Sequence, residues 1–519
     1  MTSQFIPDPF TVEILRRDFS QTVQNRASFE PAYLSWTAFG GPERAELTAV
    51  GQPDHLLDLV SLLRCGVTVR DRRAEPVWWG YVEEVVVELE AVEVRVTLAD
   101  LANEVSVQYD YTSPENTRGD RNLTPSAADR RSQAEFGVKT RLLHQANIDD
   151  PHALALRDTW LAQHAWPVSR LSQRQSPGPI RARLVCVGWF QTLDWQPYTE
   201  LEGFYANYGP GPGAFSFGRD ASARYVGQSF QPEADSALKF ASFMLRNVGG
   251  ATRTLTARLQ ADEGGHPGTV LATSTPLSPV GWPESAYAWA RFTFATACPL
   301  TAGQRYWVTL DPNGLNGGQY FMLRLDENMT FTGGVGRYYN ESAGAWYVFP
   351  PADKPDTLFR FVCVSDTAAQ CLAMAETGGQ FFTRISVEPT GIETSPYRNT
   401  GQTCLAEIQK LMELGTQNQR LILATVSPNR QLRFYEQPQP SQPDLYLDRQ
   451  SRFFTRQGVQ LLPWRPPVGR FARFSGTDRI SQPWDRQRLP VCLIAGAEYW
   501  PQTGKSRIRA VGGERMLEG

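Results

Sequence analysis

Hydrophobic and polar residues alternate most regularly between Pro53 and Tyr109. The leucine-rich segment 56–63 follows a proline and an acid and ends before Gly66, which is typical of a short helix. In the segment 92–98, valine or leucine occupies every second position, which predicts a β-strand with one buried face. Together these patterns predict a helix, a hairpin and meander strands that form a small antiparallel barrel or half-barrel.

The segments around this stretch extend the prediction. Glu83 and Glu84 interrupt an apolar face of the hairpin, so we expect a β-bulge there. The continuous apolar run 185–195 predicts a further strand. We therefore divide the first part of the chain into a barrel domain, residues 1–110, and a mixed α/β domain, residues 111–204.

The composition changes after residue 204. Residues 205–214 read YANYGPGPGA, a glycine- and proline-rich linker. Short apolar runs separated by turn residues follow it, with almost no helical periodicity, and they predict an inserted jelly-roll-like β-sandwich over residues 205–365. The predicted strands are 226–230, 238–245, 255–260, 289–294, 306–310, 320–325, 345–349 and 358–364.

Residues 366–519 return to a mixed pattern. Helical periodicity in 368–376 and 403–414 alternates with strand-like segments, and the last part is rich in proline and arginine. We assign this part to a second barrel or mixed domain. The fold class predicted for the whole chain is mainly β with some α+β character.

Composition narrows the class of protein. A chain of 519 residues exceeds what one hydrophobic core usually organises. The 51 basic residues nearly balance the 54 acidic residues, so no overall charge attracts nucleic acid or an anionic membrane. No apolar stretch is long enough to span a bilayer, and no signal-peptide pattern is present, so we expect synthesis in a cytoplasm. The seven cysteines lie mostly in apolar runs, which predicts neither disulfides nor a zinc site.

A set of motifs occurs in order in the outer parts of the chain. The motifs are Trp79 to Val82, Leu101 to Asn103 with Val105 and Tyr109, Ser132 to Gly137, Pro466 to Phe474, and Glu498, Tyr499, Thr503 and Gly504. This order, over residues 1–204 and 366–519, resembles the tail hub, distal tail or baseplate hub-like proteins of tailed bacteriophages. The resemblance implies hub-type small β-barrels in a homotrimeric ring, with a hexamer as the alternative. It also implies contacts with other tail proteins: the tail tube, the distal tail or tape-measure protein, and a central fibre.

The middle segment contains a second set of motifs. They are Gln228 to Phe230, the strand and turn at 255–262, Pro267 to Leu271, and Leu300, Gly303, Tyr306 and Trp307. This set resembles the β-sandwich domains called choice-of-anchor, which occur on bacterial surface proteins and phage tails. The alternative explanation is that any jelly roll repeats such turns.

Motifs for catalysis or metal binding do not stand out in the sequence. It has five histidines and contains no HExxH, Gly-x-Ser-x-Gly or Cys/His cluster. A packed or solvated helical side chain is the preferred interpretation of His164, near Trp160. Glu83 and Glu84 alternate across a strand and therefore do not flank one glycosidic bond. We predict no enzyme activity, no catalytic residue, no metal and no cofactor, and a hinge rather than a phosphate loop at Gly209 to Gly213.

Aromatic residues of the predicted sandwich are the one functional candidate. Aromatic faces stack on the apolar side of a sugar ring, and neighbouring polar side chains bind its hydroxyls. A glycine-rich loop or hairpin tip is expected to bring together Tyr338, Tyr339, Asn340, Glu341 and Trp346. We predict a shallow glycan platform of Tyr338, Tyr339 and Trp346, with hydrogen bonds from Asn340 and Glu341. The alternative is that these aromatics pack the sandwich core.

One functional interpretation accounts for both resemblances. The chain is expected to be a structural virion protein of the phage tail tip, a hub ring that connects the tail tube to the tip. Its outward β-sandwich would serve host attachment by binding a surface glycan. The protein would be made in the host cytoplasm and located in the virion. The alternative is a non-viral cell-surface carbohydrate-binding or adhesion protein; a glycoside hydrolase lacks the carboxylate pair.

Overall fold

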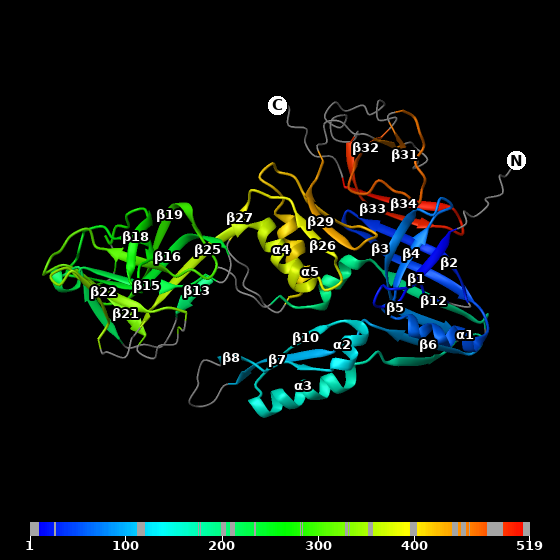
Figure 1. Cartoon of the computed structure of the whole chain (residues 1–519), viewed down its shortest axis with the longest axis horizontal. Helices are drawn as coiled ribbons and strands as arrows, with labels where there is room; N and C mark the ends of the chain where they lie inside the picture. Colours follow the sequence, from blue (N-terminus) through cyan, green and yellow to red (C-terminus); the bar gives the residue numbers. More distant parts are fainter. Residues whose placement is uncertain are drawn as a thin grey trace. The chain divides into compact units, whose positions relative to one another are not determined.

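Strands dominate the structure and form several sheets (Figure 1). The computed structural model describes residues 10–24, 27–111, 120–174, 176, 178–198, 204–207, 213–232, 235–280, 282, 284–326, 331, 333–350, 356–394, 402–438, 445–447, 453–455, 457–474 and 491–511. The mainly β fold predicted from the sequence is confirmed. Unit 1 comprises Met1–Tyr198, Cys371–Ile392 and Gly401–Gly519, and unit 2 comprises Thr199–Gln370 and Glu393–Thr400. The predicted limits of the sandwich, residues 205 and 365, both lie in unit 2.

Unit 1 is built on a large sheet whose strands come from distant parts of the chain. Among the described residues, its main path follows the order β1-β4-β5-β12-β3-β2-β33-β32-β30-β31. The bounds are Thr11–Leu15 (β1), Ser28–Thr37 (β2), Phe39–Val50 (β3), Gly66–Arg70 (β4), Pro76–Glu88 (β5), Arg181–Val187 (β12), Leu445–Leu447 (β30), Phe453–Thr455 (β31), Phe471–Phe474 (β32) and Val491–Trp500 (β33). Because β2 pairs with both β3 and β33, segments from both ends of the sequence join in this sheet.

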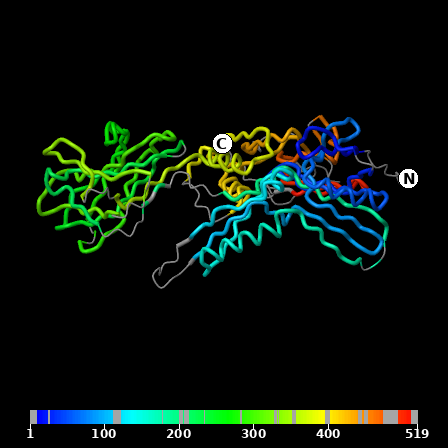
Figure 2. Tube along the Cα trace, turned by 60° about the horizontal axis from the view of Figure 1, so that its bottom comes forward, coloured from blue at the N-terminus to red at the C-terminus, as the bar shows by residue number. Residues whose placement is uncertain are grey.

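Further strands extend the large sheet at its sides. β6 (Val92–Thr97) pairs with β5, and β11 (Ser169–Gln173) runs beside β6, as Figure 2 shows. The remaining strands of this sheet are β26 (Arg384–Val387), β28 (Ile422–Val426), β29 (Gln431–Glu436) and β34 (Lys505–Val511). The strand predicted over residues 92–98 is therefore present.

The predicted bulge lies at the paired carboxylates of β5. In the register of β5 with β12, Glu84 is opposite Val185, and Val82 is opposite Cys186. Glu83 is therefore the extra residue, and the prediction of a bulge is confirmed.

A smaller sheet and several helices complete unit 1. The small sheet consists of β7 (Glu104–Tyr111), β8 (Asp120–Leu123), β9 (Ala127–Ala128) and β10 (Thr140–Ala146). The helices are α1 (Pro53–Leu57), η1 (Asp58–Leu62), α2 (Arg130–Phe136), α3 (Asp150–His164), η2 (Trp189–Trp195) and α5 (Cys404–Glu413). Two further elements, α4 (Thr367–Gly378) and the short strand β27 (Glu393–Thr394), lie in the segments where the chain passes between unit 1 and unit 2. Side-chain oxygens of Asp129, Asp149 and Thr403 cap α2, α3 and α5 at their N-termini.

The apolar run 185–195 is not one strand, contrary to the prediction. β12 ends at Val187, and the 3-10 helix η2 follows with both of its tryptophans buried. Gly188 connects the two elements. A glycine is needed there, because a Cβ would lie 1.8 Å from the carbonyl oxygen of Pro42. Apolarity alone does not distinguish a buried strand from a buried helical turn.

Unit 2 contains two sheets, named here by a central strand of each. The β16 sheet consists of β13 (Phe204–Asn207), β14 (Ala214–Phe217), β16 (Ser236–Val248), β19 (Ala288–Leu300), β21 (Tyr320–Asp326), β24 (Asp356–Thr357), β25 (Phe359–Asp366) and β27. The β15 sheet follows the order β18 (Pro267–Thr273), β17 (Thr256–Asp262), β20 (Tyr306–Asp311), β15 (Tyr225–Phe230), β22 (Gly336–Asn340) and β23 (Ala345–Val348). The short helix η3 (Ala221–Ala223) precedes β15.

One hydrophobic core lies between these two sheets. Phe230 and Val308 of the β15 sheet belong to the same buried cluster as Phe243, Phe292 and Phe361 of the β16 sheet. From β15 to β21 the chain passes repeatedly from one sheet to the other, as in a jelly roll. Because alternate residues of each strand enter the core, the others form an outer face on each sheet.

Candidate functional site

The outer face of the β15 sheet carries the candidate site. On the neighbouring strands β15 and β20, Val226, Val308 and Leu310 are fully buried in the core. The residues that alternate with them, including Tyr225 and Thr309, therefore point to the outer face. The periodicity of the strands thus selects which side chains point away from the core.

Three aromatic rings form a row across neighbouring strands of this face; we call Tyr225, Tyr339 and Trp346 the aromatic row. Tyr225 of β15 pairs in register with Tyr339 of β22, which pairs with Trp346 of β23. The centroids of the two tyrosine rings are 5.6 Å apart, and those of Tyr339 and Trp346 are 5.2 Å apart. Each side chain is partly exposed. Cross-strand pairing thus holds a continuous apolar platform at the surface.

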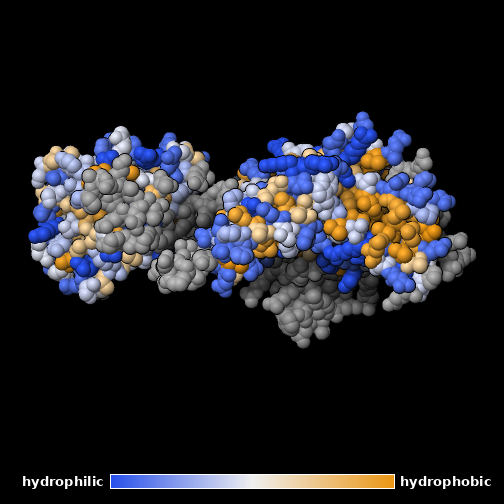
Figure 3. Space-filling view, turned by 90° about the horizontal axis from the view of Figure 1, so that it is seen from below, coloured by the Kyte–Doolittle hydropathy of each residue, from blue (hydrophilic) through white to orange (hydrophobic). Residues whose placement is uncertain are grey.

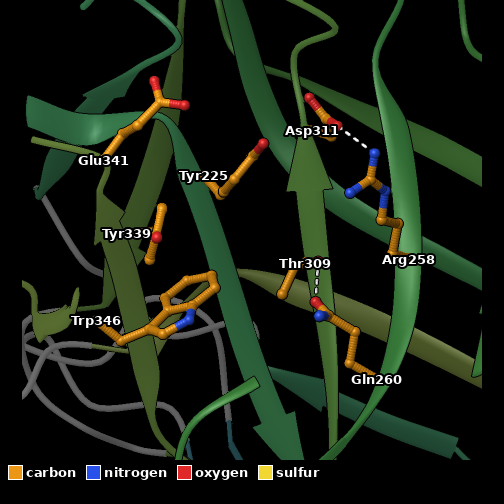
Figure 4. Close-up of a pocket in the computed structure, with 8 residues that line it drawn as sticks. All are labelled: Tyr225, Arg258, Gln260, Thr309, Asp311, Tyr339, Glu341 and Trp346. Carbon is orange, nitrogen blue, oxygen red and sulfur yellow. Dashed lines mark hydrogen bonds and ion pairs between the residues drawn. The ribbon is translucent and has the colours of Figure 1, made fainter. Parts of the chain in front are cut away.

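Polar side chains from β17 and β20 lie beside the aromatic row (Figure 4). Arg258 Nη2 donates a hydrogen bond to Asp311 Oδ2 at 2.5 Å. Thr309 Oγ1 donates to Gln260 Oε1 at 2.6 Å. These bonds fix charged, hydroxyl and amide groups in position next to the rings, where they can bind a polar ligand.

The aromatic row and the polar side chains line an open concavity of about 340 Å³. Glu341 completes its lining at the end of β22. Gly227 lies on the central strand, in register between Thr309 and Arg337. A Cβ at Gly227 would lie only 2.9 Å from Thr309 Cγ2, so a side chain there would disturb the face. The glycine keeps the surface low between the rings and the polar groups.

Charges that line the concavity are paired with opposite charges. Asp311 forms its ion pair with Arg258, and Glu341 forms one with Arg224. The Arg224 guanidinium also lies 5.0 Å from the ring centroid of Tyr225. Burial raises the pKa of the Tyr225 phenol, and the negative charge of Asp311 raises it further. Near neutral pH Tyr225 therefore offers a neutral hydroxyl group.

The structure separates the five residues predicted from the sequence into two groups. Tyr339, Glu341 and Trp346 line the concavity. Tyr338 points to the opposite face of the hairpin, where its ring lies 4.8 Å from that of Phe215. Asn340 also lies outside the lining, and its Oδ1 accepts a hydrogen bond from the backbone N–H of Ala343 in the turn. The predicted loop or hairpin tip is the hairpin of β22 and β23; residues 338–340 belong to strand β22, so consecutive side chains alternate in direction.

Sequence reasoning missed the lining residues that come from other strands. These are Tyr225, Arg258, Gln260, Thr309 and Asp311. Each of these residues alternates with core residues along its strand, and this alternation is visible in the sequence. Their proximity depends on the order β17-β20-β15-β22-β23, which no local pattern specifies.

Metal-ligand clusters and His164 give no further candidate site within the described residues. No group of three or more His, Cys, Asp or Glu side chains is placed to hold a metal ion there. The ring of His164 stacks on Trp160 at 4.2 Å, and its Nδ1 lies 3.0 Å from the carbonyl oxygen of Trp160. A search of the described helices for a segment long and apolar enough to cross a membrane found none.

Comparisons with known proteins assign no family to the chain. No protein-family model and no curated protein matches it. A glycoside hydrolase family 43 arabinoxylan arabinofuranohydrolase from Bacillus subtilis is similar at 8% identity and a TM-score of 0.16, over 57% of this chain and 64% of that chain. The mosquito-larvicidal Cry4Aa toxin from Bacillus thuringiensis is similar at 8% identity and a TM-score of 0.16, over 61% of this chain and 57% of the toxin. The infectious bursal disease virus Gx strain structure is similar at 11% identity and a TM-score of 0.15, over 69% and 76% of the two chains.

The matched segments therefore cover less than two thirds of both Bacillus proteins. Similarities this weak support no argument about the function of the chain.

Proposed function

We propose that the chain is a non-enzymatic structural protein of a phage tail tip, a hub ring whose unit 2 binds a host-surface glycan. The ordered motifs of residues 1–204 and 366–519 support the hub assignment, since they resemble tail hub proteins. The motifs of the middle segment, which resemble choice-of-anchor domains, support an attachment role for unit 2. The mainly β architecture is compatible with both assignments.

The observation that carries the glycan proposal is the concavity on the β15 sheet. A pyranose ring has an apolar face and an edge of hydroxyl groups, so it needs an aromatic platform beside fixed polar groups. The aromatic row supplies the platform, and Arg258, Gln260 and Asp311 supply donors and acceptors next to it. Gly227, which lies between them, lets the Thr309 side chain lie close against β15.

An exposed strand edge in unit 1 supports the proposal of a ring. All five residues of β11 are exposed. β11 pairs with β6 on one side, and no described strand pairs with its other side. Leu171 of β11 is 72% exposed opposite Val94, and Figure 3 shows apolar side chains gathered on one face of unit 1. Edges and apolar patches of this kind are usually covered, which a neighbouring subunit in a homotrimer or hexamer would do.

Electron microscopy of the purified full-length chain tests the hub proposal. We expect closed rings of three subunits, or of six as the alternative. Particles that remain monomeric at micromolar concentration would remove the hub proposal. They would leave the cell-surface glycan-binding alternative, which the concavity fits equally well.

Affinity electrophoresis tests the glycan proposal separately. The full-length chain is run in native gels that contain a neutral polysaccharide, chosen in turn from glucans, mannans and galactans. We expect one of these polymers to retard the wild type and to leave a Gly227→Val variant unretarded, because the added side chain fills the low part of the face. The matched control is Gly317→Val, where a Cβ meets no atom within 4 Å. Equal mobility of the wild type in every gel would count against glycan binding.

A further inference from the structure

The outer face of the β16 sheet is rich in arginine. In the central parts of β16, β19, β21 and β25, the positions that alternate with core residues are 240, 242, 244, 246, 289, 291, 293, 320, 322, 324, 360 and 362, whereas Asp326, Asp366 and Glu393 lie at strand ends or on the short β27. The alternating positions hold Arg246, Arg291, Arg324 and Arg360 and contain no aspartate or glutamate. Strand order brings these arginines together, because β16 pairs with β19, β21 and β25.

Aromatic rings lie against these guanidinium groups. Arg291 Cζ is 3.7 Å from the ring centroid of Phe240, and Arg360 Cζ is 3.8 Å from that of Trp289. Arg246 and Arg324 lie on the same ring, 5.4 Å and 5.3 Å from the centroid of Tyr287. Cation–π contacts of this kind position the guanidinium groups at the surface and cover the ring faces. A guanidinium that rests on a ring still presents N–H groups along its edge to an incoming oxygen.

Three of these arginines lack an ion pair. Arg246, Arg291 and Arg324 contact no carboxylate among the described residues, in contrast to Arg258 on the other sheet. Within the described part of the chain, Arg246 donates only to the sulfur of Met322, at 2.7 Å. Like charges gathered on one sheet repel one another unless anions approach them. The face is therefore complementary to a chain of negative groups.

We propose that this face binds an acidic glycan polymer, whose carboxylate or phosphate groups accept hydrogen bonds from Arg246, Arg291 and Arg324. The planar guanidinium fork suits both anions, because each offers two oxygens at matching spacing. Single-stranded nucleic acid fits less well, because base stacking needs free aromatic faces and these rings are covered by arginine. The choice of a glycan among the remaining polyanions rests on the proposed function of unit 2. The site is distinct from the concavity on the β15 sheet.

Affinity electrophoresis of the full-length chain at low salt tests this proposal. The gels contain polygalacturonate, which carries carboxylates, or a phosphomannan, which carries phosphates. We expect at least one of the two polymers to retard the wild type. Replacing Arg246, Arg291 and Arg324 together with Gln should raise the dissociation constant by about tenfold, the effect of three exposed ion pairs. Raising the salt to about 0.5 M should release the wild type, because screening weakens exposed charge pairs.

Two further variants separate a lost contact from a lost fold. Arg291→Gln alone removes the exposed arginine of the set and should weaken retardation about twofold. Its matched control is Arg305→Gln, an exposed arginine of the same unit that forms no ion pair within the described residues, and this control should behave as the wild type. The triple Arg→Lys variant keeps the charge and should keep part of the retardation.

The outcomes distinguish this proposal from the proposed function. No retardation by either acidic polymer, or equal weakening by Arg291→Gln and Arg305→Gln, overturns the second site. Tighter binding of an oligodeoxythymidylate or of phosphatidylglycerol vesicles shows that the ligand class is wrong. If Tyr339→Ala abolishes polyanion binding, the two faces do not act as separate sites. If an acidic polymer retards the chain and no neutral polysaccharide does, glycan binding in the concavity is excluded, whereas the arginine-rich site stands.

Discussion

The two outer faces of unit 2 use similar residues in opposite arrangements. On the β15 sheet, Arg258 is paired with Asp311, and the rings of the aromatic row remain partly exposed. On the β16 sheet, Arg291 has no carboxylate partner among the described residues, and its guanidinium covers the ring of Phe240. One face therefore offers apolar rings with neutralised charges, whereas the other offers charges with covered rings. Both faces lie over the same core, so the scaffold carries two chemistries at independent positions.

The contrast shows that an aromatic residue takes its role from its neighbours across the strands. Tyr225 and Tyr339 stack on each other and remain partly exposed at the surface. A ring beneath a guanidinium, as Trp289 lies beneath Arg360, instead positions a charge. Aromatic content alone therefore does not identify a binding face.

The largest expected effect comes from removing two rings of the aromatic row. Replacing Tyr339 and Trp346 with Ala should weaken binding of a neutral polysaccharide about thirtyfold or more, since each stacked ring contributes about 1–3 kcal/mol by analogy with base stacking. If the chain forms a ring, the loss of binding to cells should be complete, because avidity multiplies the effect at each site. Affinity electrophoresis and cell binding measure the two losses. The melting temperature should change little, because both side chains lie on the outer face.

Tyr347 provides the matched control for this pair. It neighbours Trp346 on β23, is 42% exposed, and stacks on Tyr338 on the opposite face of the hairpin. Tyr347→Ala should leave glycan binding unchanged. Unfolding of the double variant, or equal loss in the control, would mean that the comparison between the faces is wrong.

A second prediction separates neighbouring tyrosines of β22. Tyr338 packs against the core, with its ring 4.8 Å from Phe215 and 6.0 Å from Phe349. Tyr338→Ala should therefore lower the free energy of unfolding by about 2–4 kcal/mol, as for a large core side chain. Tyr338→Phe should have almost no effect. Chemical denaturation measures both, and a stable Tyr338→Ala variant without glycan binding would return this residue to the platform.

A third prediction concerns a carboxyl group between the two faces. Asp356 is 2% exposed and lies in register opposite Asp326, which is also buried. The pKa of Asp356 is raised to about 7: burial is the largest cause, a hydrogen bond from Gln228 at 3.1 Å lowers the pKa, and the charge of Asp326 raises it. The unfolded chain loses this proton near its ordinary pKa, at lower pH than the folded chain. The stabilisation is therefore complete below about pH 4 and is lost as the pH rises through about 7.

Calorimetry of the wild type and of Asp356→Asn tests this pH dependence. The melting temperature of unit 2 should fall in the wild type between about pH 4 and pH 7, and it should fall less in the variant, which has no ionisable group at position 356. Parallel curves for the two proteins would exclude Asp356 as the titrating group.

Much of the fold could be predicted because the strand periodicity is local. Alternation over residues 92–98 identified β6, and the paired carboxylates identified the bulge at Glu83. The prediction of one strand over 185–195 failed because its many apolar residues are compatible with burial in either a strand or a helical turn.

The candidate site could be predicted only in part. Tyr339, Glu341 and Trp346 are close in sequence, so a single hairpin brings them together. The residues that supply most of the polar lining, such as Arg258, come from strands that are distant in sequence, and their register is set by the whole sandwich. Tyr338 was included because the segment was interpreted as a loop or hairpin tip in which neighbouring side chains gather; in strand β22, alternation places it on the opposite face.

The smallest effect is expected at the rim of the concavity. Glu341 is exposed and forms an ion pair with Arg224. Exposed ion pairs contribute little free energy, so Glu341→Gln should change the affinity for a neutral polysaccharide by less than about threefold. The amide keeps a hydrogen-bond acceptor for a sugar hydroxyl, whereas Glu341→Ala removes it and should weaken binding further. Titration calorimetry of the two variants against the same polysaccharide distinguishes these cases. A large loss with Glu341→Gln would show that the ligand needs a negative charge at this face, contrary to the contrast drawn between the two sheets.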